Sequence, residues 1–270
     1  VNWRIPGPEL KFEEKWMPPT HVETPDAPTR DMSITVGWNT AQSYGITREE
    51  MDAWAARSHH RAIAAIDAGK FVDEIMPLKV QQFDGSVIEF SVDEHPRRDT
   101  TVEKLAQLKP LHPEIEGFSI TAGNSSGTND AAAAVAVVDA DFAKAENLTT
   151  MATVRAWAAA GVAPRDTGLG AVAVIGKVLD RAGLKPSDVA LWEINEAFAS
   201  VPIAACREYG LDEELVNFSG SGCSLGHPIA ASGARMVTTL VYELQRRGGG
   251  IGVAAMCAGG GQGGAVVIEV

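Results

Sequence analysis

Hydrophobic and polar residues recur with recognisable periods along much of this chain, and the first clear period is helical. Thr47 and Glu50 stand in capping-box spacing, and apolar or small residues then follow at helical intervals until Gly69. That stripe consists of Met51, Trp54, Ala55, Ser58, Ala62 and Ile66. The stretch 71–117 is polar and mixed, and within it only "SVIEFSV" at 86–92 predicts a strand.

The two ends of the chain differ in pattern. Residues 1–30 are rich in proline and charge and show neither a helical nor a strand period, so they predict an irregular segment lying on the surface. From residue 118 onward glycine and alanine are frequent, and helical and strand patterns alternate. This part predicts helices at 168–184, 195–210 and 226–250, a strand at 189–194, and two final strands at 251–258 and 264–270. Such alternation indicates an α/β fold that ends in a hairpin of buried strands.

Composition excludes several classes of function. A chain of 270 residues can bury a sizeable core, and its formal net charge of −12 disfavours general binding to nucleic acid or to an anionic membrane. We expect a cytoplasmic protein, because there is neither a signal-peptide pattern nor an apolar run of membrane-spanning length. The three cysteines, Cys206, Cys223 and Cys257, are too few for a disulfide framework and predict reduced thiols. Since residue 1 is Val1 rather than methionine, we expect further residues upstream.

Three motifs in the last third contain residue types suited to acyl transfer. In "SLGHPIAASGAR", His227 precedes Pro228, which suits the first turn of a helix. The ring is then expected at the positive end of the helix dipole, where an imidazole stays neutral. In "EINEAF", Asn195 stands at the junction of the predicted strand and helix. In "CAGGGQGG", Cys257 ends a strand beside glycine amides able to donate to an oxyanion.

Each motif taken alone also has a structural interpretation. Cys257 suits a small apolar filler of the core, Asn195 a helix cap, and His227 a cap or a core histidine. Cys223, His227 and Cys257 would make a zinc site only with a fourth ligand, and none stands at suitable spacing. We therefore expect no metal.

Together and in this order, "NEAF", "GHPIAASGAR" and "CAGGGQGG" resemble the signature of the thiolases. Upstream, "GITREEMDAWAARSHHRAIAAIDAGKFVDEI", "RRDTTVEKLAQLKP" and "TAGNSSGTNDAAAA" are similar to the family's loop-domain helix, its linker and its pantetheine-binding turn. The resemblance covers nearly the whole chain. It is closest to the degradative thiolases, which cleave 3-ketoacyl-CoA with free CoA.

The resemblance implies catalytic roles for the matching residues. His227 would activate the nucleophilic cysteine and contribute to a first oxyanion hole, which a water held by Asn195 completes. Cys257 would be the general acid/base that moves a proton to or from the α-carbon of the acetyl unit. The amide of Gly259 would belong to a second oxyanion hole.

The resemblance also implies how coenzyme A binds and how the chain is organised. Ser126 and Gly127 would bind pantetheine and Arg97 the nucleotide, with CoA as substrate and no cofactor. The implied fold is the thiolase fold, a five-layer α/β/α/β/α sandwich of two similar halves. Here 1–118 would be the loop domain, 119–148 the end of the N-terminal half and 149–270 a complete C-terminal half. Members are dimers or tetramers of dimers, so we expect a homo-oligomer.

One departure from the family concerns the nucleophile. Thiolases have it in the N-terminal third, whereas no cysteine here precedes Cys206. We expect the nucleophile region to be truncated, cleaved off or on another chain. Two functions follow from this. The first is a thiolase that forms acetyl-CoA and a shortened acyl-CoA, with Claisen condensation as the reverse reaction. The second is a non-catalytic subunit that binds acyl-CoA or stabilises a partner.

Two further departures are substitutions within the motifs. "SGSGCSLGHP" has Ser219, Gly220 and Ser221 where the family has asparagine and paired glycines, and Cys223 at an apolar position. Trp38 replaces a common glutamate in the domain that shapes the acyl pocket. This suggests a bulky acyl group, long-chain or polycyclic as in steroid degradation.

Overall fold

The computed structural model describes residues 20–270, so most of the segment predicted to be irregular at 1–30 lies outside the described residues. The first part of the described chain contains a π-helical turn, four helices and a two-stranded hairpin. In order they are η1 (Ser33–Trp38), α1 (Asn39–Tyr44), α2 (Arg48–Asp67), β1 (Leu78–Gln81), β2 (Val87–Phe90), α3 (Val102–Ala106) and α4 (Ala140–Ala145).

The second part has the predicted α/β character, with a mixed sheet, four α-helices and three short 3₁₀ helices. Its elements are β3 (Thr153–Gly161), η2 (Pro164–Asp166), α5 (Leu169–Ala182), η3 (Pro186–Asp188), β4 (Leu191–Ile194), α6 (Ser200–Tyr209), η4 (Glu213–Leu215), α7 (Gly222–Leu225), α8 (Ser232–Arg246), β5 (Ile251–Ala258) and β6 (Gln262–Glu269). No helix within 20–270 is both long and apolar enough to cross a membrane.

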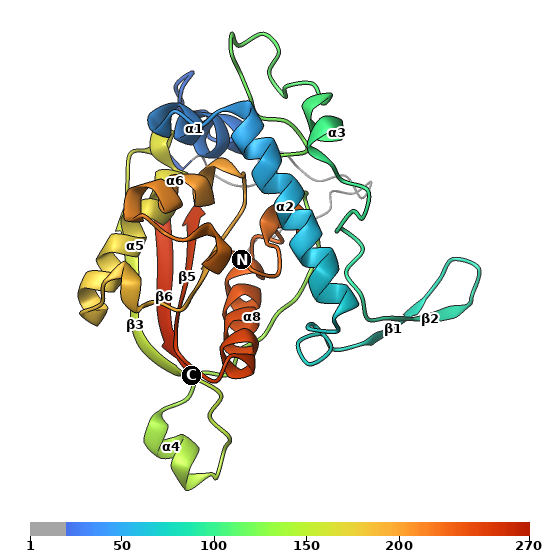
Figure 1. Cartoon of the computed structure of the whole chain (residues 1–270), viewed down its shortest axis with the longest axis vertical. Helices are drawn as coiled ribbons and strands as arrows, with labels where there is room; N and C mark the ends of the chain where they lie inside the picture. The colour runs from blue at the N-terminus through green and yellow to red at the C-terminus, as the bar shows by residue number, and fades with distance from the viewer. Residues whose placement is uncertain (1–19) are drawn as a thin grey trace.

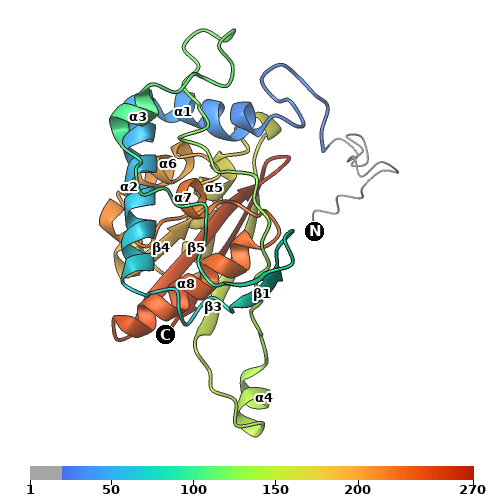
Figure 2. The ribbon, with the colours of Figure 1, turned by 90° about the vertical axis from the view of Figure 1, so that its right-hand side faces the viewer.

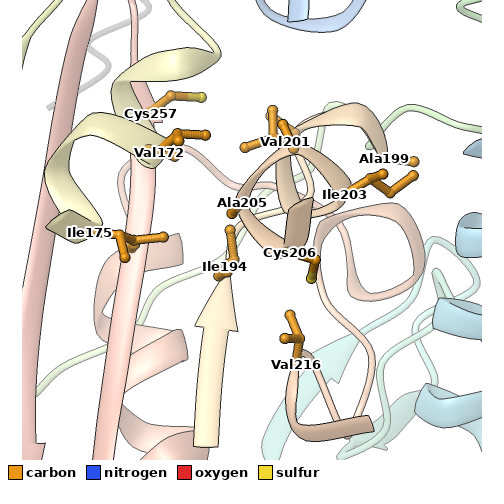
Figure 3. Packing of buried hydrophobic residues seen from close by; sticks show 14 of the residues in the cluster. Val172, Ile175, Ile194, Ala199, Val201, Ile203, Ala205, Cys206, Val216 and Cys257 are labelled. Atoms are coloured by element: carbon orange, nitrogen blue, oxygen red, sulfur yellow. The ribbon is translucent and has the colours of Figure 1, made fainter. Parts of the chain in front are cut away.

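The mixed sheet is the centre of three layers. Its strand order is β3-β6-β5-β4, with β4 and β5 parallel and the other two pairings antiparallel. Helices α5 and α6 lie on one face and α8 on the other (Figures 1 and 2). Strand β5 shows the alternation: Val253, Ala255 and Cys257 pack toward α5 and α6, whereas Ala254 packs toward α8. Figure 3 shows the first of these cores from close by, with Cys257 beside Val172.

Glycines let α5 approach the sheet closely. A Cβ at Gly263 of β6 would lie 1.9 Å from the carbonyl oxygen of Gly170, and one at Gly170 would lie 2.3 Å from that of Gln262. Any side chain at either position would therefore collide with backbone. Gly263 of the cysteine motif and Gly170 of α5 thus allow helix and sheet to come together.

Helix α2 agrees well with its pattern. Thr47 accepts a hydrogen bond from the Glu50 amide, and the Glu50 carboxylate accepts one from the Thr47 amide, which completes the capping box. All but one member of the predicted stripe is buried, Ile66 being partly buried. The predicted strand at 86–92 corresponds to β2, which pairs with β1 in an exposed hairpin that projects from the end of α2 (Figure 1).

Two predicted helix starts are wrong. The helix predicted from 195 begins at Ser200, and the one predicted from 226 begins at Ser232. In both places the intervening residues form hydrogen bonds with a distant segment of the chain. Asn124 accepts a hydrogen bond from the Ala199 amide, and Asn129 accepts one from the His227 amide.

The outer edge strand β3 was not predicted, because it is rich in alanine and much of it is exposed. Its edge is partly covered by cations from α5. Lys177 donates to the Ala159 carbonyl at 2.8 Å, and Arg181 donates to the Trp157 carbonyl at 2.6 Å. The Arg181 guanidinium also lies 5.4 Å from the centre of the exposed Trp157 ring.

An apolar segment before β3 is extended and open to solvent. Residues 131–138 read "AAAAVAVV", are all exposed and belong to no helix or strand. Within the described part of the chain, their backbone amides and carbonyls have no hydrogen-bond partner. Unpaired amides and carbonyls along an extended apolar segment can pair with another strand, so this segment lacks a neighbouring strand here.

Candidate active site

Three segments far apart in sequence meet beside the C-terminal end of β4. The turn at 124–129 is joined to the loop after β4 by a bridge between Ser125 and Phe198. The Ser126 amide also donates to the Ala197 carbonyl at 2.9 Å. The third segment, 221–232, runs through α7 to the start of α8. The structure thus brings Ser126, Asn195 and His227 into one region.

Asn195 and His227 are in direct contact. The Asn195 Nδ2 atom lies 3.2 Å from His227 Nε2 and 3.3 Å from Nδ1. Ser232 Oγ lies 2.7 Å from His227 Nδ1 and donates to the Pro228 carbonyl at 3.2 Å. The hydroxyl has one hydrogen, so both bonds form together only if Nδ1–H donates to Ser232. That tautomer leaves the lone pair on Nε2, which becomes the basic atom of the ring.

His227 is neutral for a reason that differs from the predicted one. Because α8 begins five residues later at Ser232, the ring is not in its first turn. Instead, burial of the ring lowers the pKa of His227 from 6.5 to about 4, and the positive charge of Arg235 contributes further. Arg235 is itself held by the fully buried Glu193 at 2.7 Å, and burial raises the pKa of Glu193 to about 7.

Lowering the pH from 6.5 to 4 is expected to destabilise the fold through His227. Between these values the unfolded imidazole binds a proton and the folded one does not, so unfolding becomes more favourable as the pH falls. The His227→Asn variant has no such group and should lose less melting temperature than the parent over this range. Thermal melts of both proteins in small pH steps measure the difference. Equal losses would contradict the lowered pKa.

Cys257 lies in the core and not against His227. Its side chain is 5% exposed and packs toward α5 and α6 (Figure 3), whereas the adjacent Met256 faces Gly233 of α8. Across residues 20–270 its Sγ atom has no hydrogen-bond partner. Burial raises the pKa of the Cys257 thiol to about 12. The thiol is therefore protonated at neutral pH, which suits a proton donor.

Gly259 begins the turn between β5 and β6. Gly260 and Gly261 follow with φ of +82° and +83°, a conformation that favours glycine. The Gly259 carbonyl accepts from the Gln262 side chain, and the Gly259 amide has no partner within the described residues. The nearest atom to a Cβ at Gly259 would be Met32 Cε, at 4.0 Å. The Gly259 amide is thus available as a donor, next to the partly buried side chain of Met32.

Arg97 is exposed, and its backbone is connected to the same region. The Arg97 amide donates to His59 Nδ1 at 3.1 Å, and the His59 ring stacks on His95 with centroids 6.3 Å apart. His95 Nε2 would lie 2.6 Å from a Cβ at Gly127. The three residues predicted to bind CoA, Arg97, Ser126 and Gly127, therefore lie on neighbouring segments.

Sequence reasoning missed Glu196, the residue after Asn195. Its fully buried carboxylate accepts four hydrogen bonds from residues that lie far away in the sequence. The donors are Trp54 Nε1 at 2.8 Å, Asn217 Nδ2 at 2.8 Å, Ser58 Oγ at 2.6 Å and the Cys223 amide at 3.1 Å. Glu196 thereby joins α2 to the site loops, and its signal in the sequence is an acidic residue two positions after a buried strand.

Two polar atoms of the site region are buried without a partner in the described part of the chain. They are Oδ1 of Asn195 and Oε1 of Glu193. All three cysteines are reduced and buried. Within 20–270 no group of three or more histidine, cysteine, aspartate or glutamate residues is placed to hold a metal ion.

Comparison with known proteins shows what the chain is similar to. The family model described as "Thiolase, N-terminal domain" matches residues 25–141, and "Thiolase, C-terminal domain" matches 148–270. Acetyl-CoA acetyltransferase of Pseudomonas aeruginosa is 48% identical over 237 residues, which is 88% of this chain and 60% of that protein.

Two solved structures share the fold. The acetyl-CoA acetyltransferase of Bacillus anthracis has a TM-score of 0.80 and 43% identity, covering 86% of this chain and 58% of that one. Human mitochondrial 3-ketoacyl-CoA thiolase in complex with CoA has a TM-score of 0.77 and 38% identity, covering 86% and 57%. The chain spans about 60% of the length of the curated relatives it matches. It has the thiolase fold, and it belongs to the thiolase family.

Proposed function

We propose that this chain provides the acid/base and CoA-binding part of a thiolase that cleaves 3-ketoacyl-CoA with free CoA. The products are acetyl-CoA and a shortened acyl-CoA, and Claisen condensation is the reverse. The observation that carries the proposal is the contact between Asn195 and a neutral His227, whose Nε2 carries the lone pair, accepts from the Asn195 amide nitrogen and is the basic atom of the ring. The names of the relatives, acetyl-CoA acetyltransferase and 3-ketoacyl-CoA thiolase, support the same reaction class.

In the proposed first half-reaction, His227 Nε2 takes the proton of a nucleophilic thiol. The thiolate attacks the 3-keto carbon and forms a thioester, the bond between C2 and C3 breaks, and its electron pair passes to C2. Cys257 then donates its proton to C2, which releases acetyl-CoA. The Cys257 pKa of about 12 supports this donor role, because a weak acid gives up its proton only to a strong base such as this carbanion.

In the second half-reaction, the thiolate of Cys257 takes the proton of CoA, and the CoA sulfur attacks the acyl thioester. The nucleophile leaves and recovers its proton from His227, so the protons balance. The free Oδ1 of Asn195 supports its role in holding a water at the first oxyanion hole. The free amide of Gly259 supports a second oxyanion hole.

Coenzyme A is proposed to bind as a substrate at Ser126 and Gly127 with its nucleotide near Arg97, and no cofactor is required. The chain of contacts from Arg97 through His59 and His95 to Gly127 supports one continuous binding surface. We also propose a bulky acyl group, long-chain or polycyclic as in steroid degradation. Its support is Trp38, which packs on Phe118 with ring centroids 5.1 Å apart.

We propose that the nucleophilic thiol belongs to a further thiolase region, on the same polypeptide or on another. All three cysteines present are buried, and none contacts His227 in the described part of the chain. The unpaired strand-like segment 131–138 supports a sheet completed by that region. In this arrangement 1–118 is the loop domain, 119–148 the end of the N-terminal half and 149–270 the C-terminal half of a cytoplasmic homodimer or tetramer.

The burial of all three cysteines also favours a second candidate function, a non-catalytic subunit that binds acyl-CoA esters. Trapping the acyl-enzyme decides between the two. The 270-residue chain alone should form no acyl adduct with acetoacetyl-CoA or a longer 3-ketoacyl-CoA, whereas the full-length protein should form one. Intact and peptide mass spectrometry measure both. An adduct on Cys223 or Cys257 at the turnover rate would overturn the assignment of the nucleophile, and no adduct in the full-length protein would favour the second function.

A further inference from the structure

Asn129 contacts the catalytic histidine through the backbone. Its Oδ1 atom accepts a hydrogen bond from the His227 amide at 3.1 Å, across 98 positions of sequence. The same oxygen would lie 2.4 Å from a Cβ at Gly226, so the carboxamide packs closely on that α-carbon. Gly226 has a φ of +91°, which also favours glycine. Asn129 therefore fixes the position of the backbone at Gly226 and at the His227 amide.

His95 holds the same segment from a second point. Its Nδ1 donates to the Ser224 carbonyl at 2.7 Å, because a carbonyl only accepts. A Cβ at Gly127 would lie 2.6 Å from His95 Nε2 and 3.0 Å from Asn129 Oδ1. Gly127 is thus enclosed between the two side chains, and the His59 ring supports His95 from behind.

These contacts matter because His227 lies outside any helix. Helix α7 ends at Leu225 and α8 begins at Ser232. The His227 amide consequently has no helical carbonyl to donate to, and the Asn129 side chain is the acceptor it uses. A displacement of the backbone here would move Nε2 away from Asn195.

We propose that Asn129 and His95 are positioning residues that hold the Ser224–His227 backbone against the turn at Gly127 and so fix the His227 ring beside Asn195. The inference rests on the proposed function for the role of His227. Neither residue touches the reacting atoms. The turn proposed to bind pantetheine and the catalytic base then move as one unit.

Hydrogen exchange tests the contact without reference to activity. In the full-length protein, Asn129→Ala should speed exchange of the His227 amide about 5-fold, the effect of losing one hydrogen bond. Asn129→Asp keeps an acceptor oxygen in place and should restore protection. Thr128→Ala is the matched control, because Thr128 is exposed on the same turn and forms no hydrogen bond with any described residue. NMR or peptide-level mass spectrometry reads the exchange.

Steady-state kinetics tests the positioning role. Asn129→Ala should lower kcat about 10- to 100-fold with KM within about 2-fold, the pattern expected when a catalytic group is misplaced. Asn129→Asp should recover most of kcat at an unchanged melting temperature. His95→Ala, which removes the second contact, should also lower kcat and provides a separate test if Asn129→Ala does not fold.

The outcomes distinguish failure of the positioning role from failure of the proposed function. Unchanged exchange and unchanged kcat in both Asn129→Ala and His95→Ala would overturn the positioning role. If Asn129→Ala speeds exchange of the His227 amide but the parent protein has no thiolase activity, the contact is confirmed and the proposed function is refuted. Equal losses in Asn129→Ala and Asn129→Asp, tracking a lower melting temperature, would show a purely structural residue and would also overturn the proposal.

Discussion

Replacing His227 by alanine in the full-length protein should slow acyl transfer by about 10⁴-fold, because it removes a general base and an oxyanion-hole donor that are each worth about 10²-fold or more. The melting temperature should change little at neutral pH. The ring is only partly buried, and Ser232 keeps its bond to the Pro228 carbonyl. Rapid-quench measurement of the acyl-enzyme isolates this step from product release.

His60→Ala is a suitable control for the His227 experiment. His60 lies on α2 and bonds to the Thr100 carbonyl at 2.9 Å, so this variant also loses an imidazole and one hydrogen bond. It should retain the parent rate. Near-normal acyl transfer in His227→Ala would return His227 to the role of a capping or core residue.

Replacing Cys257 by alanine should separate the two kinds of chemistry. Acylation by a simple acyl-CoA needs no carbanion, and the CoA thiolate that it releases is a weak base that can leave without a proton from Cys257, so this reaction should survive. Cleavage or condensation at carbon should fall at least about 10²-fold, because the proton donor to C2 is lost. The two reactions are measured side by side on the same preparation, together with its melting temperature.

Cys206→Ala provides the matched control for Cys257→Ala. Both thiols are buried in the same apolar core, so both substitutions leave a small cavity and a similar loss of stability. Only Cys257→Ala should change the ratio of the two reactions. If both variants lose acylation and carbon chemistry in parallel with melting temperature, Cys257 is a packing residue and the acid/base role is refuted.

Local signals in the sequence predicted those parts of the fold that depend on near neighbours. The capping box of α2, its buried stripe and the apolar run of β5 are properties of a few adjacent residues, and the structure confirms them. The starts of α6 and α8 were wrong because they depend on distant residues, the backbone carbonyl of Asn124 for α6 and the side chain of Asn129 for α8. Pro228 is compatible with the first turn of a helix, and no residue near it in the sequence indicates that Asn129, 98 positions earlier, holds the His227 amide.

The same distinction applies to the site. Asn195, His227 and Cys257 stand in motifs whose order is itself informative, so sequence alone could single them out. Their surroundings depend on contacts between residues far apart, such as Ser58 with Glu196. A sequence pattern also could not reveal that Cys257 faces the α5 and α6 core, since that follows from the pleat of β5 in a sheet covered on both faces.

The two cations on β3 have a consequence for how these molecules associate. An edge strand with free carbonyls can accept a strand from another molecule and begin a continuous intermolecular sheet. Lys177 and Arg181 already occupy two of those carbonyls, and a newcomer would have to displace both and bring its backbone past their charges. Growth of the sheet beyond β3 is therefore disfavoured, which protects the protein from aggregation along this edge.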